Sequence, residues 1–450
     1  MNADTPSPKH QEQLRLRRLR TLLVRARDDS LTRNSVFIMA TTVVNSALGA
    51  VFWVVAARTF STREVGLGAA LVAAVMLAAT LSNLGAGPTL IQILPTRRAG
   101  RDWSRTFNAC MGAGLGAAAL AGCIALFILP LLSPGFSVVR ESAYRVAVVG
   151  GVVVWTASTI LDFAFVAERA AGKMLKRNAA AATLRLALVL CFVALGARSS
   201  LSILSAWAGS TAVALLFGAA VLLPGLHRGY RPEARGVATE ARRLVPPFVG
   251  HYFISVGGMI PMYILPLLVT ALLSATANAY FYTTWMLCSV FFMVSPAVAA
   301  ALFAEGSHTE GSMHQKARSS AVIIAALLSV PMVVLLLGGR FVLALFGLGY
   351  AQHSYVLLVL LVVSAVPDGM TNVYVSVLRV EQRFRAAAAL NIGMGLGVLG
   401  LAWWLLPLVG VAGAGLAWLI MQVAGSAVVV IDICLRRAKL VPRADGTPDQ

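Results

Sequence analysis

Apolar residues fill most of the chain in long runs, and polar residues collect in the short segments between them. Each run has about 20 residues, the length that a helix needs to cross a ~30 Å hydrocarbon layer. The pattern therefore predicts an all-α integral membrane protein with twelve transmembrane helices. The predicted spans are residues 35–57, 67–94, 107–132, 146–167, 183–198, 203–223, 246–272, 277–303, 320–338, 354–378, 387–407 and 410–433.

Lysine and arginine are distributed unevenly over the two sides of this predicted topology. With the N-terminus in the cytoplasm, the tails and even-numbered connections carry 31 of the 37 Lys and Arg residues, and the opposite connections carry 6. This is the positive-inside bias. It predicts two cytoplasmic termini and a multi-pass protein of the cell inner or plasma membrane. The net charge of +19 does not indicate a nucleic-acid partner, because such proteins gather basic residues on a soluble face.

The two tails are polar. In residues 1–34, Leu16, Leu19 and Leu23 share one helical face and arginines fill much of the rest. This pattern is typical of a basic amphipathic helix that lies on anionic membrane lipids; a disordered basic tail is the alternative. Residues 434–450 are predicted to be a disordered cytoplasmic tail.

Two parts of the chain are related by a shift of 206 residues. The shift predicts two six-helix bundles, residues 35–223 and 246–433, joined by a cytoplasmic connection at 224–245. It aligns Asp162 with Asp368, Lys173 with Arg379, and Arg177 with Arg383.

Cysteine spacing adds no further chemistry. The five cysteines all lie in apolar runs, and no two have C-x-x-C spacing. The sequence therefore predicts no disulfide framework, no metal site and no cofactor.

Several segments resemble the polysaccharide-transport flippases of the multidrug/oligosaccharidyl-lipid/polysaccharide exporter superfamily. They are Ala57-Arg58, Glu64-Val65-Gly66 and "LGAGPTLIQILP" within 57–95, and "RFVLALFGLGYAQHS" at 340–354. With the two-bundle layout, the likeness covers about residues 31–435. It implies a MATE-like fold around a central cavity that opens to either side in turn. It also implies a lipid-linked oligosaccharide as cargo, and glycosyltransferases or a polymerase of cell-surface polysaccharide synthesis as candidate partners.

Asp368 is the most unusual residue of the apolar runs. It lies between Pro367 and Gly369 in "AVPDGMTNVY". An aqueous turn here would leave too few residues to complete the tenth span, so the carboxylate is predicted inside it, where the helix is weakened. A carboxylate at span centre costs about 2.5–3.5 kcal/mol on insertion scales, which favours a functional role. We predict a proton or cation relay, or a cavity wall that contacts sugar hydroxyls; a carboxylate satisfied by Asn372 or a neighbouring span is the alternative.

Asp162, in the fourth span, has the same two interpretations. The resemblance places the family's cavity at the first and seventh spans, which makes Asn45 and His251 further candidates. Neutral histidine changes its charge near physiological pH, but one near a helix end is commonly just hydrogen-bonded.

The chain departs from the lipid II flippases of this superfamily, which carry cations deep in the first two spans. Here those spans contain none, which argues against a peptidoglycan precursor as cargo. Arg185, at the start of the predicted fifth span, is the candidate for binding a diphosphate, and Arg58 is the outer candidate.

Two other functions fit parts of the sequence. A multidrug or cation antiporter of the same superfamily would need a coupling carboxylate; the first span has none, but Asp162 and Asp368 could serve. A membrane polysaccharide polymerase or glycosyltransferase would need acidic or arginine-rich chemistry on a large loop, and the outer connections 133–145 and 339–353 contain only Glu141 as an acid. We therefore expect a flippase and no enzyme.

Overall fold

The computed structural model describes residues 30–83, 85–97, 100–226, 230–232, 239–240, 260–306 and 313–440. Regular structure in these ranges is helical. The first half comprises α2 (Ser30–Thr59), α3 (Thr62–Ser82), α4 (Ala86–Ile93), the 3₁₀ turn η1 (Leu94–Thr96), α5 (Gly100–Leu132), the 3₁₀ turn η2 (Pro134–Arg140), α6 (Ser142–Ala167), α7 (Ala171–Ala194), α8 (Ser200–Phe217) and the π-helical turn η3 (Gly218–Leu222). The second half comprises α10 (Ile260–Leu272), α11 (Ala275–Gly306), α12 (Met313–Ala344), α13 (Leu348–Val380), α14 (Phe384–Val409) and α15 (Ala412–Leu440).

The helices confirm an all-α membrane fold. Among the described residues, ten helices are long and apolar enough to span a membrane. The shorter apolar helix α10 and the 32-residue α11 occupy the predicted spans 246–272 and 277–303. Residues 1–29, 241–259 and 441–450, which include the predicted amphipathic helix and the start of the seventh span, lie outside the described part.

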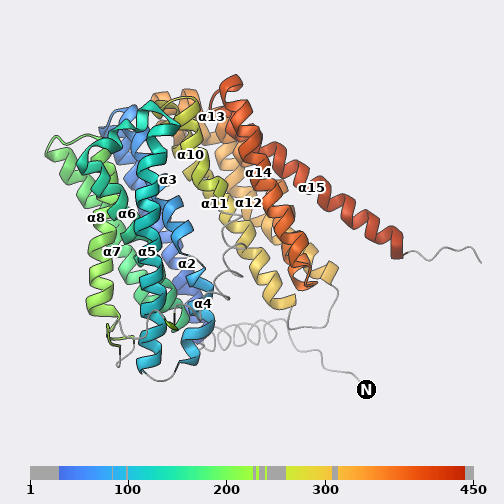
Figure 1. Cartoon of the computed structure of the whole chain (residues 1–450). Coiled ribbons are helices and arrows are strands. Elements are labelled where there is room, and N and C mark those ends of the chain that lie inside the picture. The colour runs from blue at the N-terminus through green and yellow to red at the C-terminus, as the bar shows by residue number, and fades with distance from the viewer. Residues whose placement is uncertain are drawn as a thin grey trace, which may run out of the picture.

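The helices form two lobes (Figure 1). The N-terminal lobe contains α2 to α8, and the C-terminal lobe contains α10 to α15. The lobes touch where α3 packs on α10 and α11, and they diverge toward the other side of the molecule. That other side carries Arg97, Arg169 and Arg383 in its connections, and we name it the arginine-rich side.

Helix α3 joins the two lobes. It is apolar on all sides, so its residues from Val65 to Val75 are buried, as expected of a helix surrounded by protein. Gly66 makes the close contact with the C-terminal lobe possible, because a Cβ atom there would lie 1.6 Å from the main-chain oxygen of Ala275.

Three contacts close the molecule opposite the arginine-rich side. The Asn278 amide donates to the Gly66 carbonyl at 2.8 Å, and the rings of Trp53 and Tyr282 meet at 4.8 Å between centroids. They are completed by the Arg58 guanidinium, which donates to the main-chain oxygens of Leu345 at 2.7 Å and Ala344 at 2.8 Å. We name these contacts the lobe seal.

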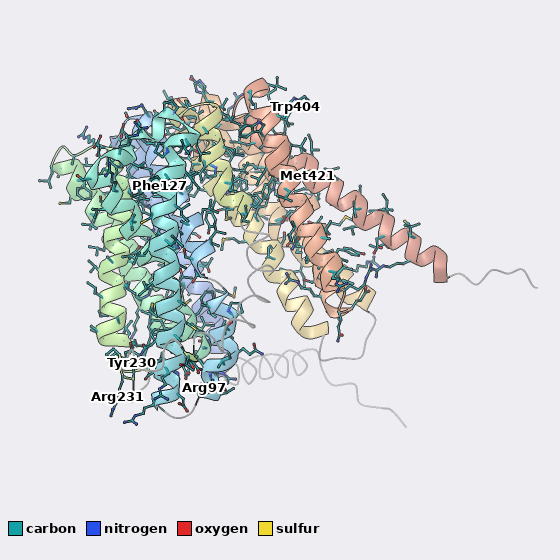
Figure 2. The ribbon with its side chains drawn as sticks, in the orientation of Figure 1. Arg97, Phe127, Tyr230, Arg231, Trp404 and Met421 are labelled. Carbon is teal, nitrogen blue, oxygen red and sulfur yellow. The ribbon has the colours of Figure 1, made fainter. Side chains whose placement is uncertain are left out.

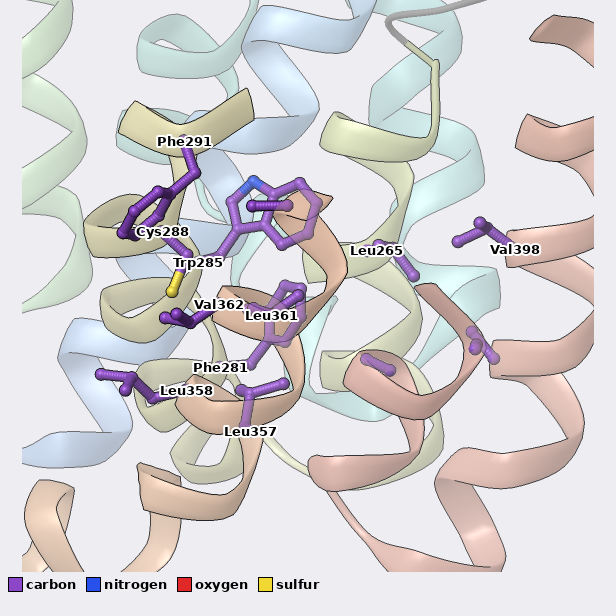
Figure 3. Packing of buried hydrophobic residues seen from close by; sticks show 14 of the residues in the cluster. Leu265, Phe281, Trp285, Cys288, Phe291, Leu357, Leu358, Leu361, Val362 and Val398 are labelled. Atoms are coloured by element: carbon purple, nitrogen blue, oxygen red, sulfur yellow. The ribbon is translucent and has the colours of Figure 1, made fainter. Parts of the chain in front are cut away.

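The C-terminal lobe packs around α11 and α13. Phe281 and Trp285 of α11 lie against Leu358 and Leu361 of α13 in a hydrophobic core (Figure 3). α13 runs unbroken through Pro367, at the place where the sequence predicted a weakened helix within the span. The Ser426 hydroxyl of α15 donates to the Pro367 carbonyl at 3.1 Å, which supports the main chain at the proline.

The connection between the lobes is anchored to the N-terminal lobe at the arginine-rich side (Figure 2). The ring of Tyr230 packs edge-on against Trp103 and Phe107, at 6.0 and 5.9 Å between centroids. Farther along, Glu240 accepts from Arg97 at 2.9 Å. The described residues of the connection therefore belong structurally to the first lobe.

Replacing Gly66 with Leu should force the lobe seal open, because the added side chain would occupy the place of the Ala275 carbonyl. Arg63 and Leu348 are exposed on the lobe-seal side of opposite lobes. Spin labels at these two positions in a cysteine-free background would then lie farther apart than in the unsubstituted protein, as measured by double electron–electron resonance. Gly116→Leu is the control, because nothing lies within 4 Å of a Cβ there. Equal label distances in the two variants would contradict the role of Gly66 in closing the lobe seal.

Candidate functional site

A cavity of about 440 Å³ lies between the lobes. Its walls come from α2, α6, α7 and α8 of the N-terminal lobe and from α11 of the C-terminal lobe. Because water is scarce at this depth, a polar cavity in a membrane protein marks a wet passage or a ligand site. The polar and aromatic lining residues are Thr41, Asn45, Ser46, Trp53, Trp155, Ser158, Thr159, Asp162, Asn178, Arg185, Trp207, Thr211, Tyr282 and Ser289.

Asp162 lines the cavity and is half of an ion pair. Its Oδ2 atom accepts from Arg177 Nη2 at 2.6 Å, and Asn178 donates to both carboxylate oxygens at 3.2 and 3.0 Å. The Asp162 side chain is 24% exposed, whereas that of Arg177 is 1% exposed. Only the carboxylate therefore faces the cavity, and Arg177 holds it from behind.

Arg177 was assigned by the sequence to a cytoplasmic connection, and that assignment was wrong. The predicted fifth span began at residue 183, but α7 begins at Ala171 and buries Arg177 within the bundle. Its aliphatic part packs over Gly218, the first residue of the π-helical turn, where a Cβ would lie 2.8 Å from the arginine Cδ. A hydropathy pattern excludes a charged helical turn from a predicted span, but a neighbouring aspartate can offset the cost of burying an arginine there.

Arg185 lies on the cavity wall with its charge uncompensated. No carboxylate in the described part of the chain forms an ion pair with it. Its guanidinium stacks on Trp207, 3.6 Å from the ring centroid, and its Nε atom has no hydrogen-bond partner. The guanidinium charge on the cavity wall favours a ligand with anionic oxygens.

Asp368 is placed differently from Asp162, although the repeat aligns the two residues. It is 6% exposed between α13 and α15, and it does not line this cavity. Gln422 donates to its Oδ1 at 3.2 Å, and Oδ2 has no partner. The Asn372 amide donates instead to the main-chain oxygen of Asp368 at 2.9 Å. Arg383, which the repeat aligns with Arg177, is exposed and pairs with Asp432 at 3.5 Å.

The remaining predicted residues separate clearly. Asn45 lines the cavity. Arg58 belongs to the lobe seal, since its guanidinium is bound to main-chain oxygens of the C-terminal lobe. His251 lies outside the described residues. Asn178, Trp155 and Trp207 also line the cavity but were not predicted, although the seven-residue spacings from Asn178 to Arg185 and from Trp155 to Asp162 place each pair on one helical face. No group of three or more His, Cys, Asp or Glu side chains suited to a metal occurs in the described part.

Solved structures with this arrangement are transporters. A lipid II flippase MurJ in an inward closed conformation matches with a TM-score of 0.67 and 11% identity, over 88% of this chain and 87% of that one. An inward-facing MATE multidrug transporter matches with a TM-score of 0.60 and 16% identity, over 91% and 96%. The fold is that of the MOP-superfamily transporters. A MOP-superfamily transporter from Pyrococcus furiosus, whose binding pocket is described as having reversed polarity, matches at 0.60 and 14%, also over 91% and 96%.

These likenesses concern the fold, because the sequences have diverged widely. No protein-family profile matches the chain, and no curated protein matches it in sequence. The MOP fold thus confirms the predicted two-bundle architecture with a cavity between the lobes, while the cargo has to be inferred from the cavity itself.

Asp162→Asn should lower the free energy of unfolding by about 3 kcal/mol, because it leaves the buried Arg177 without a counter-ion. Combining it with Arg177→Gln should restore part of the loss, since the buried charge is then removed as well. Reversible unfolding in mixed micelles measures both effects. The matched control is Arg383→Gln, which breaks an exposed pair and should cost less than about 1 kcal/mol; equal losses at the two sites would refute the distinction.

Proposed function

We propose that the protein is a flippase that moves a polyprenyl-diphosphate-linked oligosaccharide from the cytoplasmic to the outer leaflet by alternating access, for cell-surface polysaccharide synthesis. The single supporting observation that carries this proposal is Arg185, a buried cation on the wall of the interlobe cavity with no carboxylate partner among the described residues.

An anionic cargo follows from the charge of the wall. Guanidinium groups bind phosphate oxygens through paired N–H donors, and such charge-assisted bonds are about twice as strong as neutral ones. A cationic drug would meet the same arginine as a repulsive charge. The cavity also offers amide and hydroxyl groups, including Asn45, Ser158 and Thr211, that suit sugar hydroxyls.

The direction of movement rests on the charge bias of the connections. In this proposal the arginine-rich side faces the cytoplasm of the plasma or inner membrane, and both termini lie there. Basic connections would then attract anionic lipids and the diphosphate of the cargo. An inside-negative potential favours outward movement of an anion by about 2.3 kcal/mol per charge per 100 mV, so transport can proceed without ATP.

Alternating access would require the lobe seal to break. In the arrangement described here the lobes meet on the side of Arg58, Gly66 and Asn278 and diverge on the arginine-rich side. Cargo would bind from the diverging side while its lipid tail stays in the bilayer. Rocking of the two lobes would then separate the seal contacts and close the arginine-rich side behind the head group.

A cation-coupled multidrug antiporter is the second candidate, and Asp368 favours it. The carboxylate is buried with one oxygen unpartnered, and the nearby Ser295 hydroxyl has no hydrogen-bond partner either. Such a site could take up a proton or small cation as the lobes move. In proteoliposomes, export of ethidium driven by a proton or sodium gradient, with no movement of lipid-linked sugar, would favour this function.

Arg185→Gln should slow transport of a polyprenyl-diphosphate-linked sugar by about tenfold or more, because a charge-assisted hydrogen bond of about 1.5–3 kcal/mol is lost. Arg185→Lys should retain part of the rate, since it keeps the charge without the planar fork. The measurement is the rate at which a lectin gains access to a fluorescent lipid-linked disaccharide in proteoliposomes. A wild-type rate for Arg185→Gln would rule out the proposed anion site.

Asp368→Asn tests the predicted relay in the C-terminal lobe. We expect transport to fall about tenfold and to lose its response to an imposed ion gradient, because the amide cannot exchange a charge. Stability should change by less than about 1 kcal/mol, because Gln422 can donate equally to an amide oxygen. Asp102→Asn, at an exposed carboxylate, is the control. Unchanged gradient-driven transport in Asp368→Asn would end the relay hypothesis and leave the flippase proposal standing.

A further inference from the structure

The polar groups of the cavity are arranged at two depths. On α7, Arg185 and Asn178 are seven residues apart, and on α6 so are Trp155 and Asp162. Residues at this spacing share a helical face and are separated by about 10 Å along the axis. Because the helices are antiparallel and Asn178 contacts Asp162, Trp155 lies at the depth of Arg185. The cavity therefore has a deep level and a level nearer the arginine-rich side.

The deep level is cationic and aromatic. Arg185 stacks on Trp207, and the rings of Trp207 and Trp155 lie 5.5 Å apart at 35°. Arg185 lines the cavity and forms no ion pair with a carboxylate of the described residues. A cation without a counter-ion on a cavity wall indicates a place for an oxyanion, with an indole face beside it for the apolar face of a sugar ring.

The level nearer the arginine-rich side is acidic and amide-bearing. Asp162 keeps its carboxylate toward the cavity, fixed by Arg177 and Asn178. Asn45 of α2 lines the same cavity. A carboxylate whose charge is already balanced by an arginine accepts hydroxyl hydrogens well, but it repels a phosphate. The two levels thus discriminate between the two ends of a sugar phosphate.

We infer that the head group binds phosphate first: its phosphate lies at Arg185 and Trp207, the adjoining sugar ring lies on Trp155, and sugar hydroxyls reach back to Asp162 and Asn178. This orientation rests on the proposed function, because it assumes a sugar phosphate as cargo. The reverse orientation would place the phosphate against Asp162 and leave the charge of Arg185 without an anion. The sugars consequently trail toward the arginine-rich side while the phosphate occupies the deepest point.

Binding of three small probes to the protein in lipid nanodiscs tests the orientation. The probes are glucose 1-phosphate, glucose and inorganic phosphate, titrated by isothermal titration calorimetry. The wild-type protein should bind glucose 1-phosphate about tenfold more tightly than either single-featured probe. Arg185→Gln should weaken both phosphate-bearing probes about tenfold. Asn178→Ala should weaken glucose 1-phosphate severalfold and leave inorganic phosphate unchanged.

The ring contact is measured separately, by saturation-transfer NMR with glucose 1-phosphate. Trp155→Leu should remove most of the saturation transfer to the sugar protons, and Trp155→Phe should restore it, because a phenyl face remains. Trp404→Leu, at an exposed residue of α14 outside the cavity, should change nothing. Thermal unfolding of each variant separates loss of binding from loss of folding.

The results distinguish a failure of the proposed binding orientation from a failure of the proposed function. If Asn178→Ala weakens phosphate and glucose 1-phosphate equally, or if the wild-type protein binds glucose 1-phosphate no better than phosphate, phosphate-first binding is wrong. The lectin assay on wild-type protein decides the rest: movement of lipid-linked sugar keeps the flippase proposal even when the orientation fails. Absence of any such movement overturns the proposed function whatever the probes show.

Discussion

The structure depends on one constraint: an ionised side chain within the bilayer must meet an opposite charge, a dense set of hydrogen bonds, or water. The pair formed by Asp162 and Arg177 satisfies it in the N-terminal lobe. Arg177 is almost fully buried, and Asp162 is partly exposed, so the pair holds a carboxylate at the edge of a polar space without exposing the cation. Arg185 has no ion-pair partner among the described residues and meets the constraint at the cavity wall, where it stacks on Trp207. The charges on the cavity wall therefore depend on the polar space that the cavity provides.

The internal repeat shows how two similar bundles can diverge in chemistry. Asp162 and Asp368 occupy matching helices, α6 and α13, yet only the first lines the interlobe cavity. In the C-terminal lobe, Gly369 brings α13 close to Ile324 of α12, and Gln422 of α15 covers the carboxylate. Arg383, which the repeat aligns with Arg177, is exposed and forms an ion pair with Asp432. One lobe thus presents its charges to the cavity, whereas the other buries the aligned acid away from it.

Hydropathy was sufficient to place nearly every described helix, because a span needs a fixed length of apolar residues and leaves its charges outside. The same reasoning failed at Arg177, since it assumes that every charge is exposed, and it shortened α7 at its charged start. It located Asn45, Asp162 and Arg185 on the right helices, but it could not separate Arg58, which binds the opposite lobe, from the ligand-facing residues. That distinction depends on the rotation of each helix and on contacts between residues nearly 300 positions apart, and neither is contained in a pattern of apolar runs.

Helix α2 connects the site with the seal. Asn45 and Trp53 line the cavity, and Trp53 and Arg58 belong to the lobe seal. Tyr282 of α11 likewise touches both, because it lines the cavity and packs on Trp53. A ligand that draws α2 toward Arg185 must displace the contact between Trp53 and Tyr282, since a packed interface yields by switching contacts rather than by stretching them. The cavity and the lobe seal therefore share the contact between Trp53 and Tyr282, and α2 joins the two directly.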